Sequence, residues 1–259
     1  MFKDNVIIIA GASRGIGAEL VLQLASLGAR LCIAARNSQQ LEQLAVRCSA
    51  SGAEVLVCPT DLTEPEQCRY LIEQTIARFG RIDTLIYNAG KGVPGWFADN
   101  KGQEAARYEM ELNYWGMIAC LEHALPHLIA AQGRIVGIAT MGALVGLPYF
   151  SGYNAAKHAM SGFLNTLRVE LQVHKVSVTV IYPGAVATEQ LHGTLGKHIH
   201  NVPTLSPEQC ARQIILSAWQ RKRSRLTNFS GRVLYFFYRF FPTLIDKKLF
   251  TMTHIYSAQ

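Results

Sequence analysis

A glycine-rich turn between a buried apolar run and an amphipathic helix does most to limit the folds open to this chain. The apolar run is Val6–Ala10, the turn reads GASRGIG over residues 11–17, and leucines at helical spacing follow it. Backbone N–H groups and the dipole at a helix N-terminus favour an anion, and glycine lets the backbone approach it closely. The segment therefore predicts a strand–turn–helix unit that binds a pyrophosphate.

Beyond this unit, the chain repeats the alternation of a short apolar run and an amphipathic stretch up to about residue 182. The expected strands are 6–10, 31–35, 55–58, 84–87, 135–139 and 177–182, and the expected helices are 16–27, 38–50, 64–79, 102–130 and 153–174. Repeated βα units imply a mostly parallel sheet with helices on both faces. The pattern predicts a doubly wound α/β fold that binds its ligand beyond the carboxyl ends of the strands.

Length and composition favour one large domain. The chain has 259 residues, 49% of them hydrophobic, and it shows no internal repeat or low-complexity linker. We expect residues 1–220 to form the nucleotide-binding catalytic domain and residues 221–259 to form a helical C-terminal extension. The six cysteines include no C-x-x-C pair and no secretory signal precedes the first strand, so reduced thiols are expected.

The net charge of +7 lies entirely in the extension. Residues 221–259 hold eight basic side chains and one acidic one, whereas basic and acidic groups balance over residues 1–220. A nucleic-acid-binding body needs a basic face of its own. Nucleic acid is therefore not an expected partner.

The extension joins a basic run, RKRSR over 221–225, to an aromatic-rich run, VLYFFYRFFP over 233–242. Aromatic rings rimmed by cations suit the headgroup level of a lipid surface, where each basic group adds about 1 kcal/mol. Arg239 and Pro242 argue against a membrane-spanning helix. Two interpretations stay open, which are peripheral attachment to a membrane and packing on the protein's own body or on a partner subunit.

Tyr153 and Lys157 are four residues apart on an expected helix and therefore share one face. An unperturbed tyrosine titrates near about 10, and a cation within about 4–6 Å lowers that value by roughly 1–3 units. A second cation, such as an oxidised nicotinamide ring, is needed to bring the pKa near neutrality. The pair predicts a proton donor or acceptor for carbonyl and alcohol chemistry, although the same spacing also arises by chance.

Four further polar residues stand at strand ends or in an unfavourable helical position. Thr140 follows a strand and either hydrogen-bonds a substrate carbonyl oxygen or is merely structural. Asn88 also follows a strand, whose end its side chain can tie. Asp61 either accepts from an adenine amino group or caps the next helix. Asn113 sits in mid-helix against its propensity, which suggests a polar role such as holding a water.

Taken together, these residues resemble the short-chain dehydrogenase/reductase family over roughly residues 5–220. The motifs that carry the resemblance are Gly11-x-x-x-Gly15-x-Gly17, Asn88-Ala89-Gly90, Asn113, Tyr153-x-x-x-Lys157 and Pro183-Gly184. The resemblance implies a single Rossmann-type domain that binds NAD(H) or NADP(H). It implies that Tyr153 is the catalytic acid/base, that Lys157 binds the nicotinamide ribose and lowers the tyrosine pKa, and that Asn113 anchors a proton-relay water. It also implies a homodimer or homotetramer built on the two long helices.

Two positions depart from the family pattern. Thr140 stands where the family has its catalytic Ser, which keeps the hydroxyl but adds a stiff methyl group, and Ala10 stands where it usually has Thr. At the end of the second strand Arg36 replaces the acidic residue that binds the ribose of NAD. With Arg14, it favours the 2′-phosphate of NADP(H) and the reductive direction, unless both arginines are ordinary solvated charges. The expected catalytic residues are Asn113, Thr140, Tyr153 and Lys157, and the expected cofactor contacts are Gly11, Ser13, Arg14, Gly15, Ile16, Gly17, Arg36, Asp61, Leu62, Asn88, Ala89, Gly90, Tyr153, Lys157, Pro183, Gly184, Val186 and Thr188.

The resemblance places the substrate beside loops that are rich in apolar side chains. We expect Val93, Trp96, Tyr149 and Leu191 to contact it, and no metal ion to take part. The leading hypothesis is an NADPH-dependent reductase of a lipid- or steroid-like ketone in the cytoplasm, with peripheral attachment to a membrane through residues 221–259 as an addition. The alternative is an NADP(H)-binding scaffold at a membrane surface with little or no turnover.

Overall fold

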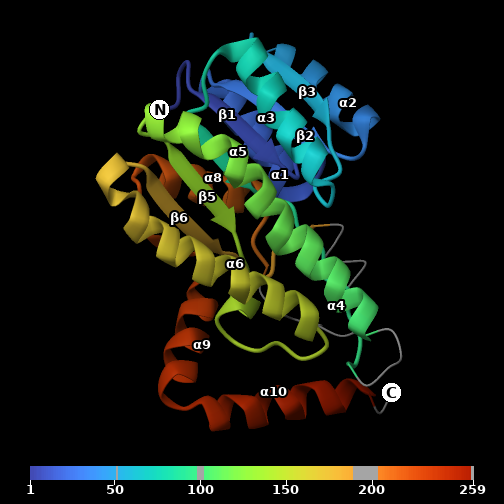
Figure 1. Ribbon diagram of the computed structural model, residues 1–259. Helices are drawn as coiled ribbons and strands as arrows, with labels where there is room; N and C mark the ends of the chain where they lie inside the picture. The colour runs from blue at the N-terminus through green and yellow to red at the C-terminus, as the bar shows by residue number, and fades with distance from the viewer. Residues whose placement is uncertain (51, 98–101, 189–203, 258–259) are drawn as a thin grey trace.

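The computed structural model describes all residues except 51, 98–101, 189–203 and 258–259 (Figure 1). Seven strands form one sheet in the order β3-β2-β1-β4-β5-β6-β7, and every neighbouring pair is parallel. The strands are β1 (Val6–Ala10), β2 (Arg30–Ala35), β3 (Val55–Pro59), β4 (Thr84–Tyr87), β5 (Arg134–Ile138), β6 (Ser177–Tyr182) and β7 (Ser224–Leu226). This arrangement confirms the doubly wound α/β fold.

Helices cover both faces of the sheet because side chains along each strand alternate between the faces. In β1, Ile7 and Ile9 belong to one buried cluster and Ile8 and Ala10 to the other. The first cluster includes residues of α1 (Gly15–Ser26), α2 (Ser38–Ser49) and α8 (Pro207–Trp219), and the second includes residues of α3 (Pro65–Phe79), α5 (Gly116–Ala130) and α6 (Ser151–Glu170). Because all strands are parallel, every described loop that follows a strand emerges at the same edge of the sheet.

The expected helix over residues 102–130 is divided into three parts. It consists of α4 (Gly102–Met110), a π-helical turn η1 (Glu111–Trp115) and α5. π-Helical turns are rare and are frequent at functional sites. Asn113, which the sequence singled out for its unfavourable helical position, lies in the middle of this turn.

The segment after residue 182 contains elements that the apolar pattern did not predict. Helix α8 begins at a capping box of Ser206 and Gln209 with Pro207 in the first turn, which is a readable helix signal. Strand β7 has only three residues, SRL, and pairs with β6. Because β7 lies inside the expected extension of 221–259, the part beyond the sheet consists of α9 (Phe229–Phe240) and α10 (Pro242–Ser257).

The helices α9 and α10 form an angled pair that stands apart from the sheet, with α10 passing below the start of α6 (Figure 1). Helix α10 faces the loop before α6, since Asp246, Leu249 and Phe250 line one small hollow together with Gly146 and Pro148. Among the described residues, no helix is both long and apolar enough to span a bilayer. All six cysteines are buried, which excludes surface thiols.

Candidate active site

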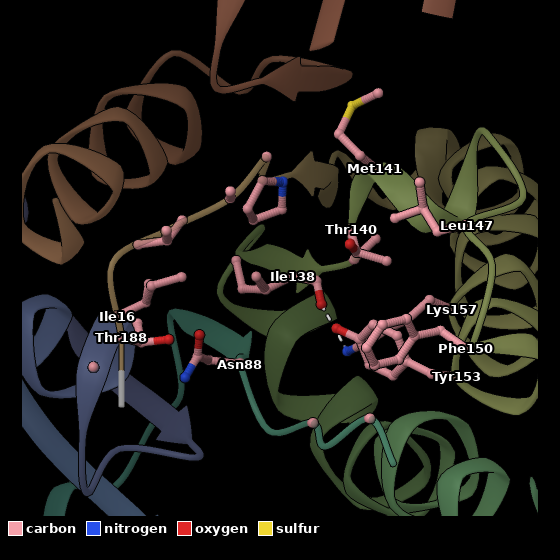
Figure 2. A pocket seen from close by; sticks show the side chains of 18 of the residues that line it. Ile16, Asn88, Ile138, Thr140, Met141, Leu147, Phe150, Tyr153, Lys157 and Thr188 are labelled. Carbon is pink, nitrogen blue, oxygen red and sulfur yellow. Dashed lines mark hydrogen bonds between the residues drawn. The ribbon is translucent and has the colours of Figure 1, made fainter. Parts of the chain in front are cut away.

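A cavity of 1580 Å³ opens at the carboxyl ends of the strands. The glycine turn after β1 and the ends of β4, β5 and β6 line it, as do α6, α9 and α10. Figure 2 shows Ile16, Asn88 and Thr188 on one side and Thr140, Tyr153 and Lys157 on the other. The cavity therefore joins the predicted phosphate turn to the predicted proton-transfer pair, which lie more than 130 residues apart in the chain.

The glycine turn is built so tightly that side chains do not fit at its first and third glycines. Gly11 has a φ of +86°, and a Cβ on it would lie 2.5 Å from the nitrogen of Ala89. A Cβ on Gly17 would overlap the carbonyl oxygen of Gly11. Asn88 Nδ2 donates to that same oxygen at 2.7 Å. The amide of Asn88 thus ties the end of β4 to the turn and fixes the shape of the anion cradle.

Asn113 points one polar atom at the centre of the site. Its Nδ2 donates to the carbonyls of Glu109, at 2.8 Å, and Lys91, at 3.0 Å. Its Oδ1 is buried and has no hydrogen-bond partner among the described residues. A Cβ on Gly90 would lie 2.6 Å from this oxygen and 2.9 Å from Lys157 Nζ, so both atoms face the same small space.

Lys157 is almost fully buried on α6, with 1% of its surface exposed. Its Nζ donates to the carbonyl oxygen of Ile138 at 2.8 Å and to that of Ala89 at 3.3 Å, and it lies 5.9 Å from the centroid of the Tyr153 ring. Burial lowers the pKa of Lys157 to about 7. The amine is therefore close to half protonated at neutral pH and can hold or release a proton.

Tyr153 does not have the lowered pKa that the resemblance implied. Burial raises the pKa of the phenol to about 12, against a hydrogen bond with Thr140 that lowers it, and the charge of Glu109 contributes to the rise. Lys157 is not among the groups that shift this pKa. At neutral pH the phenol is thus protonated in this structure, which suits a proton donor better than a base.

Thr140 lies at the end of β5 and lines the cavity beside Tyr153. Its hydroxyl oxygen accepts from the backbone nitrogen of Gly142 at 3.3 Å and caps a short helical turn, Met141–Ala143. The hydroxyl also hydrogen-bonds with Tyr153. The structural role of Thr140 is thus seen directly, and its hydrogen bond to a substrate carbonyl oxygen stays a prediction that its place in the cavity allows.

Most of the expected catalytic and cofactor positions meet in this one cavity. Gly17 and Asn113 do not reach its surface and instead support the turn and the centre of the site from below. Asp61 lines the cavity. It is not the N-cap of α3, because Glu64 holds that position. Its side chain instead accepts hydrogen bonds from the backbone nitrogen and the hydroxyl of Thr63. The expected positions that line the cavity are Gly11, Ser13, Arg14, Gly15, Ile16, Arg36, Asp61, Leu62, Asn88, Ala89, Gly90, Thr140, Tyr153, Lys157, Pro183, Gly184, Val186 and Thr188.

The expected substrate contacts are only partly brought together. Tyr149 lines the cavity, whereas Val93 and Trp96 do not. The backbone nitrogen of Val93 donates a hydrogen bond to Glu109. Trp96 packs edge-on against Tyr149, with 4.7 Å between the ring centroids. Leu191 lies outside the described residues.

The sequence did not predict that the C-terminal helices α9 and α10 form one wall of the cavity. Asn228, at the start of α9, lies so close to Gly184 that a Cβ there would contact its side chain. The signal was present as apolar residues at helical spacing in 229–237, which fit a cavity wall as well as a lipid surface. The apolar lining from this part of the chain consists of Phe229, Val233, Leu234, Phe237, Ile245 and Leu249.

Comparison of the sequence with known protein families identifies the family of this chain. The family model described as short chain dehydrogenase matches residues 5–197. The chain belongs to the short-chain dehydrogenase family. This confirms the resemblance drawn from the glycine turn, Tyr153 and Lys157, and it makes the chain a dehydrogenase or reductase by family.

Relatives within the short-chain dehydrogenase family are similar over nearly the whole chain. A dehydrogenase/reductase SDR family protein 7-like from Dictyostelium discoideum is 34% identical, over 95% of this chain and 80% of its own length. An 11-beta-hydroxysteroid dehydrogenase A from Sesamum indicum is 32% identical, over 93% of this chain and 73% of its own length. A fatty acyl-CoA reductase from Acinetobacter baylyi is also 32% identical, over 93% of this chain and 82% of its own length. The structure of an alcohol dehydrogenase from Thermococcus sibiricus, complexed with 5-hydroxy-NADP, superposes with a TM-score of 0.77 at 25% identity, over 86% of this chain and 96% of that one.

Proposed function

We propose that this chain is an NADPH-dependent reductase of an apolar ketone, lipid- or steroid-like in character. The observation that carries the proposal is the single cavity that joins the glycine turn to Tyr153, Lys157 and Thr140. The experiment that tests it is NADPH oxidation by the purified chain against a panel of medium- and long-chain and steroid ketones. Consumption of NADPH that depends on the ketone is the expected result.

The residues fit a dinucleotide with a 2′-phosphate. The glycine turn lines the cavity, and the N-terminus of α1, which begins at Gly15, faces the same space. Arg14 and Arg36 line the same end of the cavity, are exposed and form no ion pair within the described part of the chain. Two free guanidiniums beside a phosphate cradle suit a dianion. The complex of the Thermococcus sibiricus enzyme with an NADP analogue supports the same choice.

The chain's own groups supply the proton and the orientation, and the bound nicotinamide supplies a hydride to the carbonyl carbon. Thr140 and Tyr153 donate hydrogen bonds to the carbonyl oxygen, where negative charge develops. Tyr153, whose raised pKa keeps its proton at neutral pH, gives that proton to the oxygen. Lys157, with a pKa of about 7, resupplies it through a water held by the unpaired Oδ1 of Asn113.

The apolar wall supports a lipophilic substrate. Val233, Leu234 and Phe237 of α9 and Ile245 and Leu249 of α10 line the cavity on the side away from the glycine turn. A wall of this kind binds a hydrocarbon body while a few polar groups orient the carbonyl. The names of relatives that act on steroids and fatty acyl groups agree with this substrate class.

The cofactor preference is testable at Arg36. Replacing it by Asp removes a cation that pairs with the 2′-phosphate and adds an acceptor for a free ribose hydroxyl. We expect Arg36→Asp to lower the ratio of NADPH to NADH catalytic efficiency at least tenfold, since a charge-assisted bond contributes about 1.5–3 kcal/mol. The measurement is kcat/KM with each cofactor, and Arg47→Asp, at an exposed position of α2 that does not line the cavity, is the control. An unchanged ratio in Arg36→Asp would refute the NADP(H) assignment.

A second candidate function is an NADP(H)-binding scaffold with little or no turnover. The observation that favours it is Thr140, which stands where the family has its catalytic Ser and adds a stiff methyl group beside the phenol of Tyr153. The two functions are distinguished by turnover, because a scaffold binds NADPH but does not oxidise it with any ketone. If Thr140 is what weakens the chemistry, Thr140→Ser restores turnover.

We further propose that α9 and α10 rest on an anionic lipid surface. One face of α9 lines the cavity, while Phe236, Phe240 and Phe241 are exposed by 59%, 59% and 55%. Arg232 and Arg239 lie on the same helix, and α10 adds two lysines. Exposed aromatic rings flanked by cations match the headgroup level of such a surface.

Removing these rings tests the lipid contact without harming the sheet, whereas deleting residues 221–259 would remove β7. We expect the triple variant Phe236→Ser, Phe240→Ser and Phe241→Ser to bind anionic vesicles at least tenfold more weakly in sedimentation, since burying one such ring contributes about 1.5–3 kcal/mol. The matched control replaces three other exposed apolar or aromatic residues by Ser, namely Val46, Tyr70 and Val173. Equal loss of binding in both triple variants would count against a lipid-facing α9.

We also propose assembly as a homodimer or homotetramer through η1, α5 and α6. Trp115 is 50% exposed at the start of α5, and Val169 is 65% exposed at the end of α6. Exposed large apolar side chains on neighbouring helices support a contact between copies of the chain.

A further inference from the structure

A buried carboxyl group stands beside the active site without belonging to any of the motifs. Glu109, the last but one residue of α4, is 2% exposed. It forms no ion pair with another described residue. Carboxylates are almost never buried unless they are paired, so this one calls for a physical reason.

The carboxyl group joins two segments that border the cavity. Its Oε1 accepts from the backbone nitrogen of Val93 at 2.7 Å, which holds the loop that follows Gly90. Its Oε2 lies against Gly152, so closely that a Cβ there would overlap it. Gly152 is the second residue of α6, whose N-cap, Phe150, provides no side-chain hydrogen bond. A negative charge at a helix N-terminus is favourable, so Glu109 serves the first turn of α6 as a charge partner.

That first turn carries Tyr153, and the charge of Glu109 acts on the phenol. Burial raises the pKa of Glu109, and the hydrogen bond from Val93 lowers it. The charge of Glu109 in turn raises the pKa of Tyr153. The other groups that face the phenol are Lys157, one turn along α6, and the Thr140 hydroxyl at the end of β5. On the loop that follows Gly90, the Nζ of Lys91 lies over the ring of Tyr108 at 6.0 Å from its centroid.

We propose that Glu109 is a positioning residue for the reduction, which links the 91–95 loop to the first turn of α6 and sets a negative charge near the Tyr153 phenol. This inference rests on the proposed function, because it assigns Tyr153 the role of proton donor. Reduction requires the protonated phenol, so its rate falls as the pH rises through the pKa of Tyr153. A negative charge close to the phenol moves that fall to higher pH.

The test replaces Glu109 by Gln, which keeps an oxygen that accepts from Val93 and removes the charge. In Glu109→Gln the midpoint of the fall in kcat/KM for ketone reduction is expected to shift down by about one pH unit. Glu111→Gln is the matched control, because it removes the same charge two residues away on an exposed position. A midpoint in Glu109→Gln equal to that of the wild type overturns the proposal.

A second readout needs no turnover. Phenolate absorbance of Tyr153 is titrated in complexes with NADP⁺, as the difference between each protein and its Tyr153→Phe partner. The midpoint in Glu109→Gln is expected to lie about one unit below those of the wild type and Glu111→Gln. Equal midpoints contradict the inference about Glu109. A wild-type chain that titrates as expected but reduces no ketone contradicts the proposed function alone.

A third variant covers the case in which Glu109→Gln does not fold. Glu109→Asp keeps the charge but shortens the side chain by one methylene, so it cannot reach Val93 and Gly152 together. We expect an unchanged midpoint with a KM for the ketone raised about tenfold, the equivalent of one lost hydrogen bond. An unchanged KM in Glu109→Asp overturns the positioning role.

Discussion

Turnover of a ketone falls at least about 10³-fold when Tyr153 is replaced by Phe, and the affinity for NADPH stays within about twofold. The phenol faces the cavity and is protonated at neutral pH, and general acid catalysis by such a group contributes about 10²–10⁴-fold. Phe keeps the ring that packs on Phe150 at 6.3 Å between centroids, so the site keeps its shape. The measurements are kcat for ketone reduction and the Kd for NADPH from its fluorescence.

Tyr70→Phe provides the matched control, because Tyr70 loses the same hydroxyl but is 53% exposed on α3 and does not line the cavity. Its kcat is expected to stay within about threefold of the wild type, since Tyr70 has no part in the proposed mechanism. Retained turnover in Tyr153→Phe, or equal losses in both variants, would contradict the role given to Tyr153.

Gly17→Ala is expected to damage both stability and cofactor binding. The added Cβ would overlap the carbonyl oxygen of Gly11 and lie 2.8 Å from Asn88 Nδ2, the two atoms whose hydrogen bond ties the turn to β4. Overpacking at such a site costs about 1–3 kcal/mol of the free energy of unfolding. Because the displaced turn is the anion cradle, the Kd for NADPH should rise at least tenfold.

The control for this substitution is Gly162→Ala in α6, where a Cβ has open space around it. That variant should be more stable than the wild type by about 0.5–1 kcal/mol, since Ala has the better helix propensity, and its Kd for NADPH should not change. Urea unfolding and NADPH titration of both variants check the pair. Normal cofactor binding in Gly17→Ala would show that the turn does not hold the dinucleotide.

The strand and helix pattern was predictable because the sheet is buried on both faces. Runs such as Val6–Ala10 are apolar throughout, and the helices between them carry apolar residues at helical spacing. Strand β7 escaped prediction because its residues, Ser224–Leu226, form no apolar run and its place is set by pairing with β6. Local pattern carries no information about a pairing partner that lies 44 residues earlier in the chain.

The residues of the site were predictable as types and spacings, but their electrostatics were not. A Tyr and a Lys four apart on a helix must share a face, and Tyr153 and Lys157 do. The sign of the shift at Tyr153 depends on burial and on Glu109, which comes from α4 and joins α6 only in the folded chain. The apolar residues of α9 were visible in the sequence, yet only the fold shows that one of its faces lines the cavity.

The measurement that bears most directly on the enzymatic role is NADPH oxidation by the wild-type chain across the ketone panel, with Tyr153→Phe run beside it. The proposed function predicts ketone-dependent oxidation by the wild type and its loss in the variant, with NADPH bound by both. NADPH binding without oxidation on any ketone, together with turnover gained in Thr140→Ser, would contradict it and favour the scaffold.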